Sequence, residues 1–334
     1  MVATVGRAAL FAATAGCALA VLASLAGSRR GRPEWVESGG RALAGAAVGS
    51  VAALGAVAWA LLAGEFDLEY VARATSRSMT WPYRLGSLWG GMEGSLLLWC
   101  ALLNTAAVIA VSHVRRSAPA LWAGAQAVLA AVTGAALLLP LLVADPFARL
   151  AVPALDGGGL TPILEHPAML YHPPILYLGQ TMLALPFALT VAALATGRLD
   201  AAWLAATRRF ALMAWVALSA GMAAGAHWAY QEVGWGGLWA WDPVENGSLL
   251  PWLATTAFLH SALVVERRRR VGGWTAGLPL SAFVLGLLGV YLTRSGATGS
   301  VHAFAEARAV GVAVLAGVVV AALTGAALLA RRWR

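Results

Sequence analysis

Residues 119–144 read PALWAGAQAVLAAVTGAALLLPLLVA, and this stretch decides the fold class. It contains no Asp, Glu, Lys or Arg, so no charge in it opposes burial in hydrocarbon. A helix of about 20 apolar residues crosses the roughly 30 Å hydrocarbon core of a bilayer. The stretch therefore predicts a transmembrane helix.

Similar apolar runs flank this stretch on both sides, near 8–27, 42–64, 94–112, 174–197, 210–226, 250–265, 273–293 and 309–330. Most of them are rich in Ala, Val, Leu and Gly, and small residues let membrane helices pack closely. The chain of 334 residues is 60% hydrophobic and 11% charged, which excludes an ordinary soluble domain. We expect an all-α, polytopic membrane protein with about nine transmembrane helices, forming a single domain over residues 1–334.

The basic residues predict an orientation in the membrane. All 23 are Arg, and the formal net charge is +8. With nine spans, 16 of them fall on one side, near 28–41, 113–118, 198–209, 266–272 and 331–334, and 7 fall on the other. Cytoplasmic loops carry the excess of basic residues, so we expect the N-terminus outside and the C-terminus in the cytoplasm. Because the Arg runs adjoin helix ends, the charge does not predict nucleic-acid binding.

An outer loop at about 227–249 carries three Trp within seven residues. It reads Trp235-Gly236-Gly237-Leu238-Trp239-Ala240-Trp241-Asp242-Pro243-Val244-Glu245-Asn246. Trp has a large rigid face and an N–H that needs a partner, so this loop suits a platform for a flat ligand such as haem. The alternative is an aromatic belt, in which Trp merely lies at the level of the lipid headgroups.

The end of this loop has the pattern of a helix start. Asp242 precedes Pro243, and Glu245 follows three residues after Asp242, which together indicate an N-cap, a first-turn proline and a capping box. The two carboxylates are either caps alone or caps that also contact a cofactor.

Two other outer segments contain candidate ligands for a haem iron. His172 precedes Pro173 at the start of a predicted helix, so its imidazole is held at the outer mouth of the bundle. The alternative is an interfacial His that forms a hydrogen bond with a carbonyl. His166, which also precedes a proline, is a weaker candidate ligand than His172. His302 follows a segment of small residues, and Arg294 in that segment suits a propionate carboxylate. Together, His172 and His302 predict bis-imidazole ligation of one iron.

His260 lies inside a predicted transmembrane helix, where an ionisable residue is a functional hypothesis by default. It follows Pro243 by about 25 Å at 1.5 Å per residue, too far to share the outer iron. It therefore serves either a second haem in the bilayer or a hydrogen bond across the bundle. Residues 163–171 are apolar and are expected to lie on the membrane surface.

These motifs resemble the family of cytochrome c maturation protein F, the haem lyase component of cytochrome c assembly. The resemblance runs through Asp67–Trp99, His166–Gln180, Gly234–His260 and Thr293–Ala305, in order. It implies that the Trp loop holds haem b as substrate through Trp235, Gly236, Gly237, Trp239, Trp241 and Asp242, with Arg294 as a further contact. It also implies that His172 and His302 bind the outer iron, and that His260 binds a second haem b.

Two departures from the family matter. Met92 stands where the family usually has His before Glu-Gly-Ser. Family members are also about twice as long, and the second haem b ligand comes from a later helix that these 334 residues lack. We therefore expect a split or truncated protein that is completed by a C-terminal partner subunit.

The resulting hypothesis is the N-terminal, haem-binding part of a cytochrome c haem lyase in a bacterial cytoplasmic membrane. Its expected partners are a periplasmic haem carrier, apocytochrome c with its thiol-reducing and delivery proteins, and membrane lipid. No residue reads as a nucleophile or a strong base, so positioning is the catalytic contribution that remains. The alternatives are a transmembrane haem exporter and a cofactor-free assembly scaffold.

Overall fold

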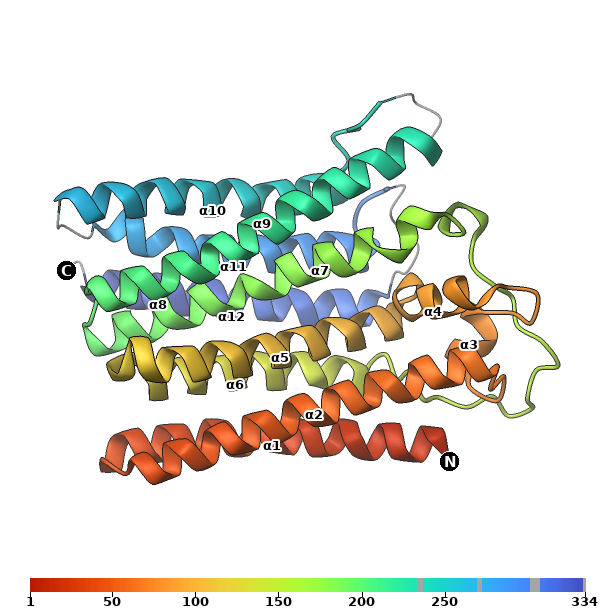
Figure 1. The fold of residues 1–334 in the computed structure, drawn as a ribbon, viewed down its shortest axis with the longest axis horizontal. Coiled ribbons are helices and arrows are strands. Elements are labelled where there is room, and N and C mark those ends of the chain that lie inside the picture. The colour runs from red at the N-terminus through yellow and green to blue at the C-terminus, as the bar shows by residue number, and fades with distance from the viewer. Residues whose placement is uncertain (233–236, 269–271, 301–306, 333–334) are drawn as a thin grey trace.

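The computed structural model describes residues 1–232, 237–268, 272–300 and 307–332, and within these ranges it is a bundle of helices without a β-strand (Figure 1). Nine spans in the described residues are long and apolar enough to cross a membrane. They comprise α1 (Val2–Arg30), α2 (Pro33–Ala63), α5 (Met92–Ser117), α6 (Trp122–Leu142), α7 (His172–Met182) with α8 (Ala184–Thr196), α9 (Ala201–Glu232), α10 (Pro243–Arg268), α11 (Gly273–Arg294) and α12 (Arg308–Arg332). Each predicted apolar run lies in one of them, which confirms the predicted fold class.

Helix boundaries follow glycine and proline. Gly31, Gly64 and Gly197 end α1, α2 and α8 in the left-handed conformation, with φ between 63° and 72°, which glycine adopts without steric cost. The fifth span is two helices that meet at Leu183. Pro186 explains the break, because it has no N–H to donate to the carbonyl of Met182 and its ring crowds that carbonyl.

Small residues bring the helices close together, as the composition predicts. In the α1–α2 hairpin, a Cβ added at Gly16 would lie 2.9 Å from the carbonyl oxygen of Ala42. Between α10 and α11, a Cβ added at Gly247 would lie 2.9 Å from the Cα atom of Gly289. Such approaches gain dispersion energy along the whole crossing, which is the main attraction between helices in lipid.

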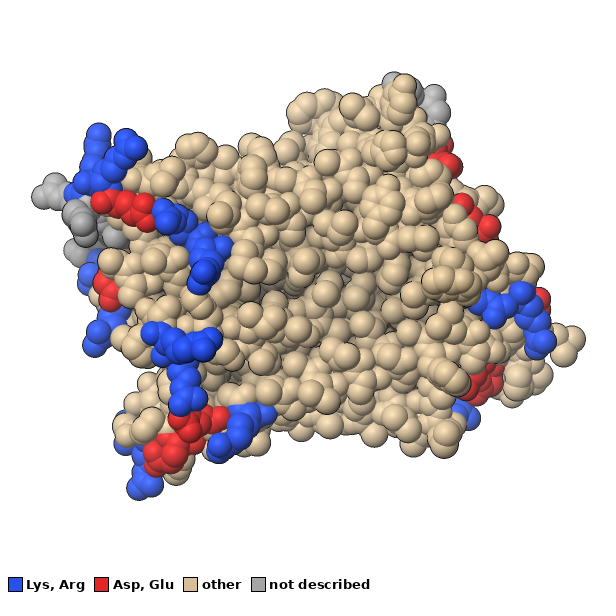
Figure 2. Space-filling model, in the orientation of Figure 1, with Lys and Arg blue, Asp and Glu red and all other residues tan. Residues whose placement is uncertain are grey.

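The two ends of the bundle differ in charge. The N-terminus lies at one end, with the long connecting segments, and the C-terminus lies at the other (Figure 1). We call these the loop end and the Arg end. Arg side chains gather at the Arg end in the view of Figure 2, where Arg208 pairs with Glu266 at 2.6 Å and Arg115 pairs with Glu37. The separation of charge follows the predicted alternation of loops.

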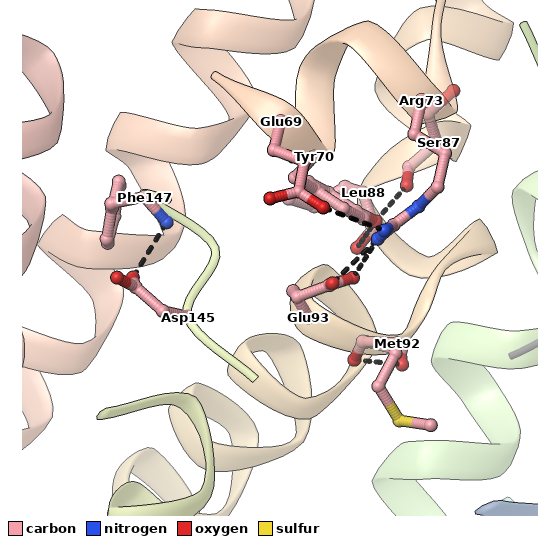
Figure 3. A network of polar contacts seen from close by, with 10 residues as sticks. Glu69, Tyr70, Arg73, Ser87, Leu88, Met92, Glu93, Asp145 and Phe147 are labelled. Carbon is pink, nitrogen blue, oxygen red and sulfur yellow. Dashed lines mark hydrogen bonds and ion pairs between the residues drawn. The ribbon is translucent and has the colours of Figure 1, made fainter. Parts of the chain in front are cut away.

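Two short helices, α3 (Glu69–Ala74) and α4 (Trp81–Gly90), cap the loop end. Tyr70 is buried, and its hydroxyl donates to the carbonyl oxygen of Ser87 at 2.6 Å (Figure 3). Burial raises the pKa of Tyr70, which keeps it a neutral donor. Arg73 donates to Glu93 in the first turn of α5 at 2.6 Å, so α3 is tied to a membrane span.

The apolar stretch at 163–171 is partly buried in the protein, and its position on the membrane surface stays a prediction. It forms two 3-10 turns, η2 (Pro162–Leu164) and η3 (Pro167–Leu170). Leu164 and Met169 are buried in a cluster with Trp228, and the indole of Trp89 donates to the carbonyl oxygen of Met169 at 2.7 Å. These buried side chains therefore find cover from α4 and α9.

Candidate functional site

The described part of the Trp loop, from Gly237 to Asp242, is not helical and ends in a complete capping box. Asp242 accepts from the backbone N–H of Val244 at 2.7 Å, and Glu245 accepts from the N–H of Asp242 at 3.2 Å. Asp242 also accepts from the hydroxyl of Ser300 at 2.9 Å, which ties the loop to the segment after α11. The predicted helix start is confirmed, and the loop joins α10 in a fixed geometry.

The two described Trp residues of this loop differ in environment. Trp241 is 71% exposed, and its φ of 58° is rare for a bulky residue. Trp239 packs against it edge to face, with ring centroids 6.3 Å apart, and the Trp239 indole N–H is buried without a partner in the described ranges. Trp235 and Gly236 lie outside the described residues. A strained, exposed indole and an unsatisfied buried donor are features that a ligand site tolerates better than a merely structural loop.

His172 is the first residue of α7 and is held from several sides. Its Nδ1 lies 2.8 Å from the carbonyl oxygen of Gly221 in α9, and its ring centroid is 5.9 Å from that of Trp228. A carbonyl oxygen only accepts, so Nδ1 carries a proton and donates it to Gly221. A Cβ added at Gly225 would lie 2.6 Å from the ring carbon Cε1, so glycine leaves the room that the imidazole occupies.

A small cavity of about 50 Å³ connects the Trp loop to His172. His172 and Gly225 line it on one side, and Trp239 and Glu245 line it on the other. The fold thus brings together two motifs that the sequence predicted separately. His302, the other predicted outer ligand, lies outside the described residues.

A second cavity of about 840 Å³ extends from His172 into the membrane-spanning part of the bundle. It lies in the size range of small-molecule and cofactor sites. Its wall is mostly apolar and includes Phe187 and Phe283, whose rings are 4.5 Å apart. The indole N–H groups of Trp99 and Trp228 in this wall are buried and have no partner in the described parts of the chain.

Arg294 is a buried cation in the wall of the large cavity. It is 8% exposed and donates to the hydroxyl groups of Ser95 at 2.8 Å and Tyr177 at 2.9 Å. Among residues 1–232, 237–268, 272–300 and 307–332, no carboxylate lies within ion-pair distance of it. A buried charge without a counter-ion is costly, so this position suits an anionic ligand, in line with the prediction of a propionate partner.

His260 lies apart from both cavities, on the outer surface of α10, where it is exposed. Its Nδ1 lies 2.8 Å from the carbonyl oxygen of Thr256 in its own helix. The predicted hydrogen bond across the bundle is therefore wrong, because the ring bonds one turn back along α10. Two stacked indoles, Trp215 and Trp252, lie beside this turn with centroids 5.7 Å apart, and Trp215 donates to the Thr256 hydroxyl at 2.8 Å.

The remaining histidines have local roles or lie on the surface. His166 accepts from the N–H of Ala168 at 3.1 Å and so caps a turn. His113, at the Arg end, packs edge to face on Phe210. His227 is exposed near the end of α9. The described residues contain no group of three or more His, Cys, Asp or Glu side chains arranged to hold a metal ion.

Several site residues were not singled out in the sequence. Tyr177 lies within the quoted His172 segment, and Trp99 and Trp228 lie within or beside apolar runs. An indole or phenol in an otherwise aliphatic span is a usable signal, because its polar hydrogen needs a partner. The carbonyl of Gly221 could not be singled out in the sequence, because every residue has a backbone carbonyl.

Comparison with known proteins identifies the family. Residues 89–299, which include α5, His172, Arg294 and the Trp loop, match the family described as Cytochrome C assembly protein. The chain belongs to this family. Within it, the chain is of the CcmF type that the resemblance predicted.

Relatives in the cytochrome c assembly family share about 40% identity with the chain. "Cytochrome c-type biogenesis protein CcmF" of Pseudomonas aeruginosa is 41% identical over 294 residues, which are 87% of this chain and 45% of the relative. "Cytochrome c-type biogenesis protein ccl1" of Rhodobacter capsulatus is 38% identical over 329 residues, which are 98% of this chain and 50% of the relative. The chain thus spans about half the length of the curated relatives that it matches.

A solved structure confirms the fold of this family member. "Cytochrome c Heme Lyase CcmF" superposes with a TM-score of 0.83 and 33% identity, over 99% of this chain and 51% of that chain. Met92, predicted as a departure from the family, is buried at the start of α5 in an apolar cluster with Leu96, Val310 and Val314. In this chain the position therefore contributes to packing.

Proposed function

We propose that the chain is the haem-binding part of a cytochrome c haem lyase, and that it holds haem at its loop end. The observation that carries the proposal is His172, fixed between Gly221 and Trp228 at the junction of the two cavities, beside Trp239. The names of the relatives, "Cytochrome c-type biogenesis protein" and "Cytochrome c Heme Lyase CcmF", support the same class of activity. The excess of Arg at the opposite end supports a loop end that faces outward from a bacterial cytoplasmic membrane.

The residues present fit a haem. Haem has a flat apolar ring, an iron that binds imidazole and two acidic side chains. His172 offers Nε2 as the ligand atom, because Nδ1 is engaged with a carbonyl. Arg294 offers a cation for a propionate, and the indoles of Trp99, Trp228 and Trp239 offer buried N–H donors. We propose His302 as the second iron ligand and Trp235, Gly236, Gly237, Trp241 and Asp242 as the remaining contacts.

The chain contributes positioning to the reaction. When bound, haem supplies two vinyl groups, and the S–H of an apocytochrome cysteine adds across each of them. His172 would hold the iron through Nε2, and Arg294 would pair with a propionate. Together they would fix the position of the haem while an apocytochrome peptide approaches. Holding two reactants in register is worth several kcal/mol of barrier, about 7–11 kcal/mol in the best intramolecular cases.

We further propose that His260 binds a second haem b together with a partner surface. His260 is exposed on α10 beside a stacked pair of indoles, so a ligand there would be covered by something outside the described chain. A C-terminal partner subunit that supplies the second axial ligand fits this position. An exporter that passes haem from His260 to His172 is less well supported, because His260 lines neither described cavity.

The test is the haem content and the cytochrome c yield of His172→Ala, with His227→Ala as the matched control at the same end of the bundle. The chain is expressed alone and with a C-terminal partner, and with a periplasmic haem carrier and apocytochrome c. We expect His172→Ala to lose the outer haem and holocytochrome formation while His227→Ala keeps both.

Two results would contradict the proposal. Unchanged haem content and cytochrome yield in His172→Ala would show that the ligand assignment is wrong. Normal cytochrome c assembly by a chain that binds no haem, alone or with its partner, would favour a cofactor-free scaffold.

A further inference from the structure

The wall of the large cavity between α6 and α12 contains several exposed residues. Leu138 and Leu142 of α6, Val143 directly after α6 and Val320 of α12 all line the cavity. The same four side chains are between 41% and 71% exposed in the described chain. Residues that line a cavity and are this exposed are the expected rim of an opening.

The packing of the helices is consistent with this opening. Within the described residues, α6 and α12 do not pack against each other along their length. At the loop end, a separate cluster of Met92, Leu96, Ala144, Val310 and Val314, with Leu139 of α6 packed against it, joins α5, the end of α6 and the first turns of α12. Val320 follows Arg308 by 12 residues, so the opening reaches about 18 Å along α12 at 1.5 Å per residue. It therefore lies along the candidate membrane span of α12.

The two parts of the cavity have different chemistry. Its body is lined by Val, Leu, Ala and Phe side chains from α5, α6, α8, α11 and α12. Its loop end holds Arg294 with the hydroxyls of Ser95 and Tyr177 and the unsatisfied indole N–H of Trp99. An apolar body below a buried cation and several donors is complementary to an amphiphile with an acidic head.

We propose that, before the chain takes up haem, this cavity binds an acidic phospholipid from the surrounding bilayer. The lipid phosphate pairs with Arg294, and one acyl chain lies in the apolar body, which it reaches between α6 and α12. Hydrocarbon fills an apolar space that is open to hydrocarbon, and the phosphate supplies the counter-ion that the described chain does not. The lipid site itself does not rest on the proposed function, but the competition of lipid phosphate with a haem propionate for the Arg294 guanidinium does.

The test uses the full chain in phosphatidylcholine vesicles with a trace of photo-crosslinking lipid that carries a diazirine near the carboxyl end of one acyl chain. One sample contains the acidic phosphatidylglycerol probe and the other a diacylglycerol probe, which carries no phosphate. Labelled residues are mapped by mass spectrometry. We expect labelling of Leu96, which is buried and lines the cavity, and a preference for the acidic probe of roughly tenfold, the value of one charge-assisted hydrogen bond.

Three variants separate the parts of the proposal. Arg294→Gln should remove the preference for the acidic probe at Leu96, and Arg294→Lys should keep it. Gly317→Leu should fill the cavity and lower the labelling of Leu96 severalfold, because Gly317 lines the cavity and a Cβ there meets nothing within 4 Å. Gly55→Leu is the matched control, since Gly55 has equal room on α2 but does not line the cavity.

Labelling confined to outward residues such as Val48 of α2 would overturn the proposal. So would an equal preference for the two probes in the unaltered chain, or Leu96 labelling that Gly317→Leu leaves unchanged. Haem absorbance is recorded on the same samples. A chain that binds haem but gives no Leu96 labelling would refute the lipid site alone, and the reverse would refute the haem assignment alone.

Discussion

Of the three histidines predicted to bind iron, the two that the structure describes lie in opposite kinds of surroundings. His172 is enclosed by α7, α9 and the Trp loop, with its Nδ1 engaged by Gly221 and its ring beside Trp228. His260 is exposed on α10, and its Nδ1 bonds within its own helix. Both rings therefore have their tautomer set by a carbonyl 2.8 Å away. The difference lies in what surrounds Nε2.

The described chain therefore supplies more of the predicted haem site at His172 than at His260. The His172 site has a cavity, a buried cation and donors already in place. Around His260 the described chain supplies one exposed imidazole and a nearby pair of stacked indoles, and we propose that a partner surface would complete the site. We therefore expect substitutions near His172 to change haem binding by the chain alone, and substitutions near His260 to matter only with a partner.

The prediction with the largest expected effect tests the difference between His172 and His260 directly. In the chain expressed alone, His172→Ala should lower haem affinity by more than the roughly 10–100-fold that the loss of an outer-shell partner costs. His260→Ala should leave the haem affinity of the lone chain unchanged and remove a haem b signal only in the presence of a C-terminal partner. Haem titration followed by absorbance measures both. Equal losses in the lone chain would show that the two sites are not distinct.

A second prediction concerns the room around His172. Gly225→Ala should push the imidazole away, because the new Cβ would lie 2.6 Å from Cε1, and haem affinity should fall roughly 10–100-fold. Gly45→Ala, on α2, has nothing within 4 Å of the added Cβ and is the matched control. An unchanged affinity in Gly225→Ala would mean that the ring position is not critical.

A smaller effect compares two helix caps. Asp242→Ala at the loop end and Asp200→Ala at the Arg end each remove an N-cap acceptor, since Asp200 accepts from the N–H of Trp203 at 2.9 Å. Each should lower the free energy of unfolding by about 0.5–2 kcal/mol. Only Asp242→Ala should also weaken haem binding, because its cap fixes the Trp loop. Parallel weakening in both variants would indicate a general loss of stability.

The prediction with the smallest expected effect concerns the stacked indoles beside His260. Trp252→Phe removes an indole N–H that donates to the hydroxyl of Ser219 at 2.8 Å. The free energy of unfolding should fall by about 0.5–1.5 kcal/mol, the value of one such hydrogen bond. Haem affinity at His172 should not change, and a measurable change there would mean that α10 couples the two sites.

The spans were predictable because a long apolar run has few alternatives in a membrane, and α6 follows from residues 119–144 almost alone. The capping box at Asp242 was equally local. The buried turn at 163–171 was not predictable, because an apolar stretch has the same pattern whether lipid or protein covers it. The carbonyl of Gly221 and the cavity that joins His172 to Arg294 depend on how α7, α9 and α11 pack, which no local pattern contains.

The break at Leu183 has a consequence for motion. It divides one membrane span into α8, in which 11 of 13 residues are buried, and α7, in which 3 of 11 are buried. The buried half is anchored in the core, whereas several residues of the half that begins with His172 border the large cavity and are only partly covered. Amide hydrogen exchange should therefore be faster in α7 than in α8, and binding of a ligand to His172 should slow it selectively. In this span α8 would stay fixed while α7 tilts, and the tilt would move the His172 imidazole at the first residue of α7.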